Sequence, residues 1–258
     1  MISWVGLAAS VLLVGVAIGV SMVLRLQLER ELIVASIRMA IQLALVGGVL
    51  TLVIADGRSI WWSWLWVAAM VGYASDVAAR RAPQVPGLRW LALGAFSVGA
   101  VVTLGVLFGL DVFPVDGRTV VPLAGMMVGN SMTATVLAGR RVVEEIGDKR
   151  DQVEARLALG KDARAASRPY VRAALRSALT PQIETTKATG LVFLPGAMTG
   201  LILAGVDPAE AVKVQAVVMF LVLAAAATTT TVVALGAASR LFTPDQRLRL
   251  ADDPSRST

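Results

Sequence analysis

A few polar and ionisable side chains lie inside otherwise apolar stretches, and these are the residues best able to do chemistry. Arg38 and Gln42 lie one helical turn apart in the apolar stretch 32–54, and Glu184 and Lys187 open the stretch 184–204. The chain has no His and no Cys. Thiol chemistry, zinc–thiolate sites and a histidine general base are therefore excluded. Charged groups are costly in apolar surroundings, which makes these side chains candidates for a binding or transport pathway.

A cation site built without His or Cys must use oxygen ligands, with the methionine thioether as a soft addition. The candidate metal ligands are Gln42, Asn130, Met132 and Glu184. The candidate pathway residues are Arg38, Gln42, Asn130, Glu184, Lys187, Pro195 (through a carbonyl that it frees), Met198 and Gln215. Oxygen ligands suit ferric iron or aluminium, whereas Arg38 and Lys187 suit a chelated metal or an anionic cargo. Two structural alternatives remain: the methionines pack as ordinary apolar residues, and Arg38 pairs with Glu184 or snorkels to the interface.

Composition shows which elements must position these residues. The chain has 258 residues, of which 56% are hydrophobic and 16% are charged, against about 25% charged in a soluble domain. A membrane span needs about 20 apolar residues. Stretches that fit are residues 4–24, 32–54, 60–75, 90–110, 120–139, 184–204 and 211–235. The sequence therefore predicts an all-α, polytopic transmembrane helical bundle of about seven spans, with residues 1–241 as a single membrane domain and 242–258 as a polar cytoplasmic tail. The alternative to seven full spans is a broken or re-entrant stretch at 120–132 or 194–201.

The basic residues predict the orientation of this bundle. The net charge is +6, and nearly all Lys and Arg in loops fall on one side of the predicted spans. The other side has Arg58, Arg118 and Lys213. The positive-inside rule then places the N-terminus outside and the C-terminus in the cytoplasm. The charge is explained by a lipid bilayer, so we expect a multi-pass protein of the inner (cytoplasmic) membrane and no nucleic-acid partner.

The segment 140–182 is the long basic interruption between the predicted fifth and sixth spans. Gly160 is expected to separate two helices, and Pro181 to limit the second. Pro169 either kinks that second helix or starts it afresh. The segment resembles the cytoplasmic coupling segment of ABC-transporter permeases, through Glu154, Ala155, Gly160 and Pro181. Arg156 departs from that pattern, and an ordinary basic loop is the alternative.

Two long motifs carry a more specific resemblance. Residues 121–132 contain Gly125 and Gly129, a spacing that lets another helix approach closely. Residues 187–215 contain Pro195 and a second such pair, Gly196 and Gly200. With Arg38 and Gln42, these motifs resemble the Fet-type (FetB-like) permease family over about residues 25–241. That family comprises membrane subunits of an ABC exporter linked to iron efflux in bacteria, with plant relatives tied to aluminium tolerance.

The resemblance implies a homodimeric permease that exports iron, another metal or a metal complex and is driven by a separate ATPase subunit. It implies no enzyme activity and no cofactor on this chain, with ATP and Mg bound by the partner. Consistently, the sequence has no Gly-x-x-x-x-Gly-Lys phosphate loop. One alternative is an ABC permease for an anionic small molecule such as a sugar nucleotide. Another is a proton-driven secondary transporter, which would need an acidic relay in mid-membrane and inverted repeats; neither is found in the sequence.

Overall fold

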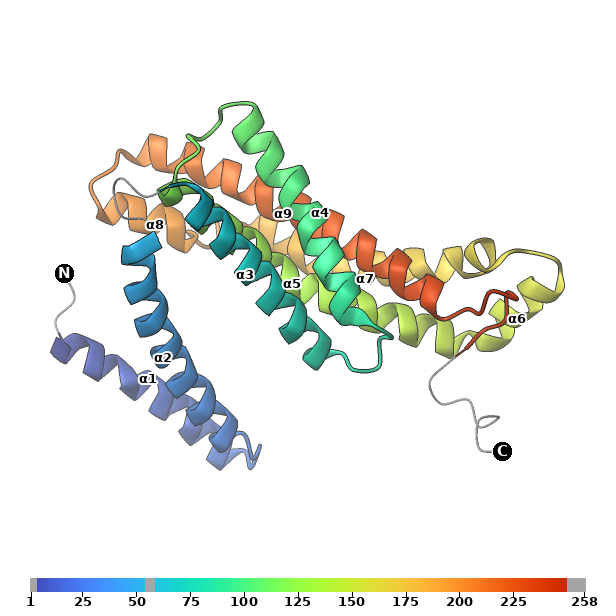
Figure 1. Ribbon diagram of the computed structural model, residues 1–258. Coiled ribbons are helices and arrows are strands. Elements are labelled where there is room, and N and C mark those ends of the chain that lie inside the picture. The colour runs from blue at the N-terminus through green and yellow to red at the C-terminus, as the bar shows by residue number, and fades with distance from the viewer. Residues whose placement is uncertain (1–3, 54–58, 250–258) are drawn as a thin grey trace. The chain divides into compact units, whose positions relative to one another are not determined.

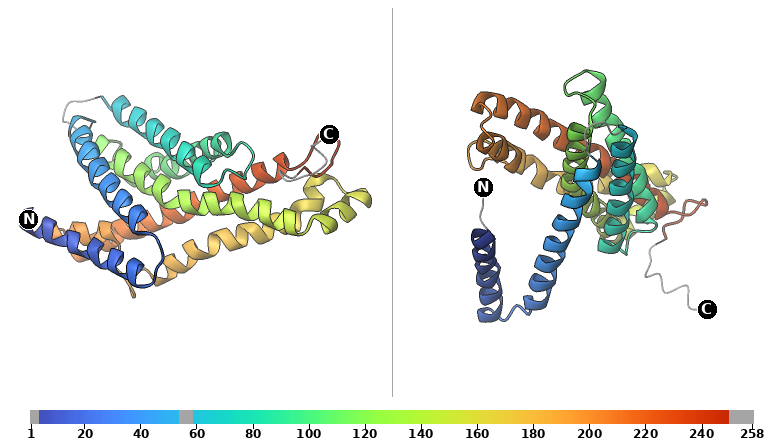
Figure 2. Two further views of the ribbon diagram at one scale, coloured as in Figure 1. Left: turned by 90° about the horizontal axis from the view of Figure 1, so that it is seen from below. Right: turned by 60° about the vertical axis from the view of Figure 1, so that its left-hand side comes forward.

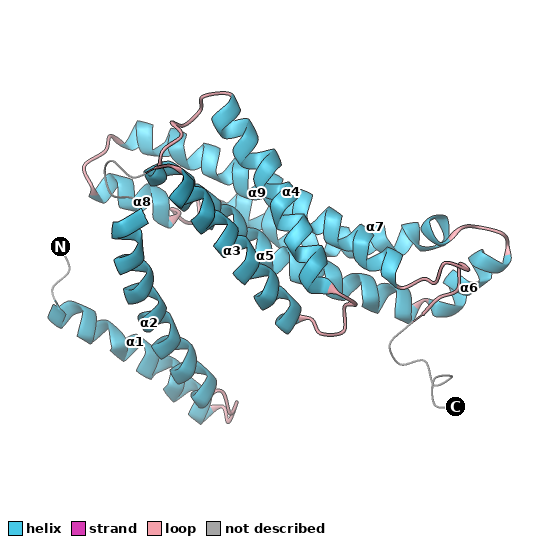
Figure 3. Ribbon diagram, in the orientation of Figure 1, coloured by secondary structure: helices cyan, strands magenta, loops and turns pink. Residues whose placement is uncertain are grey.

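The computed structural model describes residues 4–53 and 59–249, which form helices joined by loops, with no strand among these residues (Figures 1 and 3). The prediction of an all-α protein is confirmed. The chain divides into two compact units, Met1–Arg58 and Ser59–Thr258. Each is described by itself below. The predicted turn at residues 56–58 and the last part of the predicted tail, 250–258, lie outside the described residues.

The first unit is a helical hairpin of α1 (Trp4–Val23) and α2 (Glu29–Val53). Its turn is closed by Ser21, whose hydroxyl donates to Glu29 Oε1 at 2.7 Å and accepts from the backbone N–H of Leu28 at 3.1 Å. Arg25 and Gln27 have positive φ angles of 51° and 59° in this turn. Most of the apolar side chains on both helices remain exposed within the chain. Such surfaces suit contact with lipid or with another membrane helix.

The second unit is built around two long helices, α5 (Gly117–Asp148) and α9 (Pro208–Arg240). They pack along each other, with α3 (Trp61–Arg81) and α4 (Leu88–Gly109) beside them and α7 (Ala163–Ala188) against both (Figures 1 and 2). The short helices are α6 (Arg150–Ala158), which contacts α7, and α8 (Gly196–Leu203), which contacts α9. The core therefore follows the α5–α9 contact.

Small residues allow α5, α4 and α9 to approach closely. A Cβ added to Gly99 of α4 would lie 2.8 Å from Cγ2 of Thr229 on α9, and one added to Gly139 of α5 would lie 3.4 Å from Cγ1 of Val233. The sequence predicted such a role for other glycines. A Cβ on Gly129, Gly196 or Gly200 meets nothing within 4 Å, and one on Gly125 meets only Met70 Sδ at 3.9 Å. Within the described chain, close helix packing thus uses different glycines from those expected.

Five described helices are long and apolar enough to cross a membrane: Val5–Val23, Glu29–Thr51, Leu88–Gly109, Gly117–Asp148 and Pro208–Arg240. These correspond to the predicted first, second, fourth, fifth and seventh spans. The predicted third span lies within α3, a helix of 21 residues. Its C-terminal part contains the charged residues Asp76, Arg80 and Arg81. The predicted sixth span, 184–204, is not one helix: α7 ends at Ala188 and α8 begins at Gly196. A polytopic helical membrane protein is nevertheless what these five helices describe.

The coupling segment departs from prediction at its end. Gly160 does separate two helices, with φ +81° between α6 and α7. Pro181 does not end the second helix, because α7 continues through both Pro169 and Pro181 to Ala188. Each proline removes one backbone hydrogen bond, and its ring crowds the carbonyl four residues earlier. The helix persists because its buried stripe packs against α5 and α9; the buried members of that stripe are Ala166, Tyr170, Val171, Ala174 and Ala178.

The beginning of the predicted tail packs against the second unit. Leu241 and Leu248 are buried, and the backbone N–H of Arg249 donates to the Leu241 carbonyl at 2.7 Å. Gln246 Oε1 accepts from the N–H of Ala163 at 2.6 Å. At the end of α9, the Arg240 guanidinium donates to the carbonyls of Pro86 and Gly87 at 3.1 and 2.7 Å. These contacts tie the end of α9 to the α3–α4 loop and to the start of α7.

Candidate functional site

The break between α7 and α8 lies in the stretch predicted to be the sixth span. Gly190 has φ +93°, and its N–H donates to the Phe193 carbonyl at 3.0 Å in a tight non-helical loop. Pro195 follows as the N-cap residue of α8, with extended backbone and no side-chain capping bond. The loop side chains Leu191 and Val192 are exposed. Pro195 therefore starts a helix, and it does not free a carbonyl within one as the sequence had suggested.

Two predicted pathway residues meet at the start of α8. Gln215 of α9 is buried, and its Oε1 accepts from the backbone N–H of Met198 at 3.3 Å. The first N–H groups of a helix have no partner within it. Gln215 thus supplies from a neighbouring helix the cap that Pro195 cannot give with its own side chain. Discontinuous helices stabilised in this way are typical of binding sites in membrane transporters.

Two predicted ionisable residues, Glu184 and Lys187, lie on the α7 side of the break and pair with each other. Lys187 Nζ donates to Glu184 Oε1 at 2.9 Å, and both side chains are more than half exposed. Both lie in the last turn and a half of α7, directly before the loop that contains Gly190. A partner three residues away on the same helix satisfies each charge without fixing it to another element. Both groups therefore remain accessible to cargo or solvent.

The other predicted residues belong to α2 and α5. Arg38 and Gln42 share one face of α2 in the first unit with Val34, Ile37 and Ile41. Asn130 is exposed on α5, and its Nδ2 donates to the Met126 carbonyl at 2.8 Å, so its own helix provides the partner it needs. Met132 is partly buried and packs against the hydrophobic core. Among residues 4–53 and 59–249, no three His, Cys, Asp or Glu side chains lie together as a metal site would require.

The coupling residues form a compact hairpin of α6 and α7. Glu154 accepts from Arg150 Nε at 2.7 Å within α6, and the neighbouring Ala155 is exposed. Arg156 lies over the Tyr170 ring, with its guanidinium carbon 5.6 Å from the ring centroid. The Tyr170 hydroxyl donates to Gln152 Oε1 at 3.1 Å. Arg156, the residue that departs from the expected motif, therefore holds α6 against α7 through a cation–π contact.

Comparison with known proteins identifies the family. A family model described as "Uncharacterised protein family (UPF0014)" matches residues 4–242. The chain belongs to the UPF0014 family. The "UPF0014 membrane protein STAR2" of rice (Oryza sativa subsp. japonica) is 39% identical over 82% of this chain and 74% of its own length. No solved structure matches the chain.

Two further UPF0014 relatives carry names that bear on function. The "Protein ALUMINUM SENSITIVE 3" of Arabidopsis thaliana is 36% identical over 82% of this chain and 77% of its own length. The "Probable iron export permease protein FetB" of Escherichia coli (strain K12) is 35% identical over 83% of each chain. The resemblance to the Fet-type permeases is thereby confirmed. The chain is a multi-pass helical membrane protein of this UPF0014 family.

Sequence reasoning missed two groups of polar residues that the fold brings together. Thr135 of α5 and Thr229 of α9 are fully buried and hydrogen-bonded to each other at 2.8 Å. A run of four threonines at 228–231, inside an apolar stretch, was the sequence feature that indicated a polar contact there. The other group is Arg164, Arg168 and Arg172, which line one pocket from one face of α7. Their spacing of four residues was visible in the sequence as well.

Proposed function

We propose that this chain is the membrane-spanning permease subunit of an ABC exporter that moves iron, or another metal or metal complex, out of the cytoplasm. A separate ATPase subunit would supply the energy, and the chain itself would bind no ATP, Mg or other cofactor. The single observation that carries this proposal is the similarity to the Escherichia coli protein named "Probable iron export permease protein FetB", which extends over 83% of both chains. To the family membership the proposal adds three properties: the ATPase partner, the metal cargo and the outward direction of transport.

The arrangement of α7 supports a mechanical role. This helix of 26 residues begins beside the Gly160 turn and ends at the loop that interrupts the predicted sixth span. At 1.5 Å per residue it is about 39 Å long. Because α7 is continuous through both prolines, a displacement of α6 by a bound ATPase would be passed along one helix to Glu184, Lys187 and the break. In the proposal, Glu154, Ala155 and Gly160 belong to the ATPase contact, and Pro181 lies within the lever.

In the proposal the cargo passes the break between α7 and α8. There Glu184 would offer oxygen atoms to a hard cation. By residue type, Gln42 on α2 and Asn130 and Met132 on α5 remain proposed ligands elsewhere on the pathway. Arg38 and Lys187 would favour a metal that travels with an anionic chelator, and for that reason an anionic small molecule remains the second candidate. Gln215, Met198 and Pro195 would hold the break in shape.

The proposed assembly is a homodimer with two ATPase subunits in the inner (cytoplasmic) membrane. The positive-inside rule supports a cytoplasmic location for α6 and for the C-terminus. Seven crossings, with the N-terminus outside, remain the proposed topology. In this topology the five long apolar helices supply five crossings, and α3 and the α7–α8 region supply the other two. Residues 1–241 act as one membrane domain.

The test is reconstitution of the full-length chain with a candidate ABC ATPase from the same genome. ATP hydrolysis is measured in proteoliposomes while ferric citrate, or a sugar nucleotide, is added to the side that carries the ATPase, and iron is counted on the other side. We expect complex formation and hydrolysis stimulated by ferric citrate, with ATP-dependent iron movement. Iron movement driven by a proton gradient without the ATPase would refute the ABC mechanism. Stimulation by the sugar nucleotide alone would refute the metal cargo and leave the ABC architecture.

A further inference from the structure

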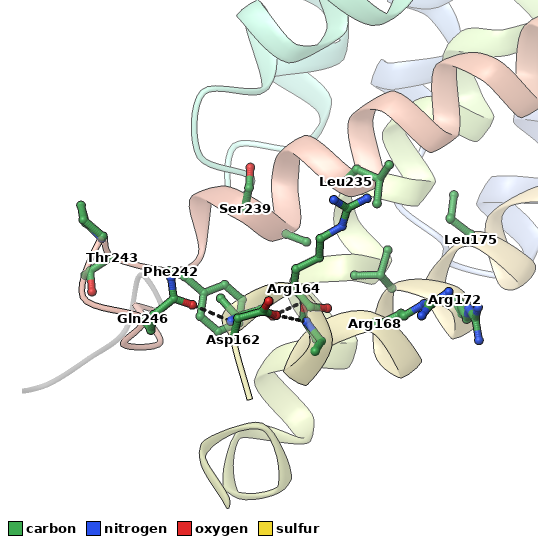
Figure 4. Close-up of a pocket in the computed structure, with 16 residues that line it drawn as sticks. Asp162, Arg164, Arg168, Arg172, Leu175, Leu235, Ser239, Phe242, Thr243 and Gln246 are labelled. Atoms are coloured by element: carbon green, nitrogen blue, oxygen red, sulfur yellow. Dashed lines mark hydrogen bonds between the residues drawn. The ribbon is translucent and has the colours of Figure 1, made fainter. Parts of the chain in front are cut away.

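A pocket of the second unit lies where α7 begins and α9 ends. Its volume is about 1030 Å³, and segment 242–246 closes one side (Figure 4). None of the residues predicted for the transport pathway lines it. The pocket is therefore separate from the break between α7 and α8.

One wall of the pocket is strongly basic. Arg164, Arg168 and Arg172 follow one another at intervals of four residues along α7, and all three are exposed. In the part of the chain that the structure describes, none of them forms an ion pair. The one carboxylate in the lining, Asp162, is engaged as the N-cap of α7, where its Oδ1 accepts from the Ala165 N–H at 2.6 Å. Three arginines thus face the pocket without neutralisation.

Apolar side chains also line the pocket. Leu235 of α9 and Phe242 come from the other side, together with the polar Ser239, Thr243 and Gln246, and Val171 and Leu175 come from α7 itself. In Figure 4 the Arg164 side chain reaches toward Leu235, while Arg168 and Arg172 lie farther along α7. Leu235 belongs to the apolar length of α9, which ends five residues later at Arg240. At 1.5 Å per residue that interval is about 7.5 Å, so the pocket spans the transition from apolar to polar surroundings.

We propose that this pocket binds an anionic phospholipid. The phosphate of the headgroup would contact Arg164, Arg168 and Arg172, and an acyl chain would lie along Leu235 and Phe242. Arginine suits this role because its planar fork of N–H groups binds phosphate oxygens in pairs. Basic pockets beside membrane helices on the cytoplasmic side recognise such headgroups. A bound lipid would bridge α7 and α9 at the end of the molecule where the proposed ATPase acts.

Charge and polarity together favour a lipid over other occupants. A free phosphate would use the arginines and would gain nothing from the wall of Leu235 and Phe242. A zwitterionic lipid would cover the apolar side chains and leave the three arginines without a net negative partner. An anionic phospholipid satisfies both kinds of side chain. The inference does not depend on the cargo or on the direction of transport.

The test uses the full-length chain, purified in neutral detergent and titrated with dioctanoyl phosphatidylglycerol, dioctanoyl phosphatidylcholine or inorganic phosphate. The readouts are the melting temperature and the lipid retained in native mass spectrometry. We expect phosphatidylglycerol to raise the melting temperature and the other two probes to leave it unchanged. Each basic side chain near an anionic headgroup contributes about a fivefold factor in affinity. The triple variant R164Q/R168Q/R172Q should therefore bind phosphatidylglycerol about a hundredfold more weakly.

The matched control is R30Q/R89Q/K149Q, which removes the same charge from exposed residues outside the pocket and should bind as the parent chain does. If the triple variant does not fold, the single variants R164Q and R168Q should each bind about fivefold more weakly. Equal losses in the control, or equal responses to phosphatidylcholine, would overturn the proposal. An equal response to inorganic phosphate would make the pocket a free-anion site. Unchanged lipid binding together with loss of the ATPase complex would make it a protein-docking face.

Discussion

The hydroxyls of Thr135 on α5 and Thr229 on α9 are hydrogen-bonded to each other at 2.8 Å, and neither side chain is exposed. The Thr135 hydroxyl oxygen also lies 2.8 Å from the Ser131 carbonyl oxygen of its own helix. Thr229 in turn donates to the Ala226 carbonyl at 3.4 Å. The pair therefore joins the two longest helices by a side-chain hydrogen bond inside an otherwise apolar contact. Its effect on stability can be measured by removing one hydroxyl while keeping the shape of the side chain.

Thr229→Val should lower the stability of the second unit. Valine keeps the volume of threonine and removes the bond to Thr135. Hydrogen bonds between membrane helices contribute about 0.6 kcal/mol on average and up to about 1.7 kcal/mol. The readout is the melting temperature in detergent. Thr231→Val is the control, because Thr231 is exposed and its hydroxyl bonds only within α9, to Ala227. Equal effects of the two variants would show that the helix-to-helix bond contributes nothing.

Gly99→Ala should destabilise the α4–α9 contact, although alanine favours helix formation over glycine by about 1 kcal/mol. The new Cβ would lie 2.8 Å from Cγ2 of the β-branched Thr229, so the helices would have to separate. Overpacking of this kind costs about 1–3 kcal/mol. Gly94→Ala on the same helix is the control, since its Cβ meets nothing within 4 Å. A melting temperature for Gly99→Ala as high as that of the control would contradict the close packing.

These two sites show what the sequence could predict and what it could not. The long apolar runs predicted five helices that are present, because apolar length alone identifies them. The glycines that matter, such as Gly99, were not identified, because small residues occur at many positions and only tertiary packing decides which ones touch another helix. The pair of Thr135 and Thr229 is separated by 94 residues, and nothing local indicates such a partner.

The coupling segment and the predicted sixth span show the same limit. Gly160 was predicted as a break because glycine interrupts helices, and it is one, with φ +81°. Pro181 was expected to end its helix, but packing of the α7 stripe outweighs the hydrogen bond that proline removes and the crowding by its ring. The sixth span was predicted from its apolar composition, and a broken or re-entrant stretch at 194–201 was the alternative. Hydropathy does not register a helix break such as the one at Gly190.

Gly160→Pro should reduce ATP-driven transport while the protein still inserts in the membrane. Proline requires φ near −65° and has no N–H, whereas Gly160 has φ +81° and its N–H donates to the Leu157 carbonyl at 2.9 Å. The cost is about 3 kcal/mol, and it falls on the turn between α6 and α7. Gly160→Asn is the control, because asparagine tolerates the left-handed conformation and retains the N–H. Normal iron transport by the proline variant, measured in the reconstituted system, would remove the turn from the coupling mechanism.

Gln215→Leu should reduce transport by loosening the break between α7 and α8. The variant leaves the N–H of Met198 without its acceptor, and an unpaired N–H of this kind costs about 1–3 kcal/mol. Gln215→Glu is the informative control, because it keeps an acceptor oxygen and a negative charge is favourable at the start of a helix. If Gln215 positions α8, glutamate should preserve assembly and much of the transport that leucine loses. If the amide itself contacts cargo, both variants should lose transport alike while their melting temperatures differ. Measuring iron transport and melting temperature on the same preparations therefore separates a positioning role for Gln215 from a contact with cargo.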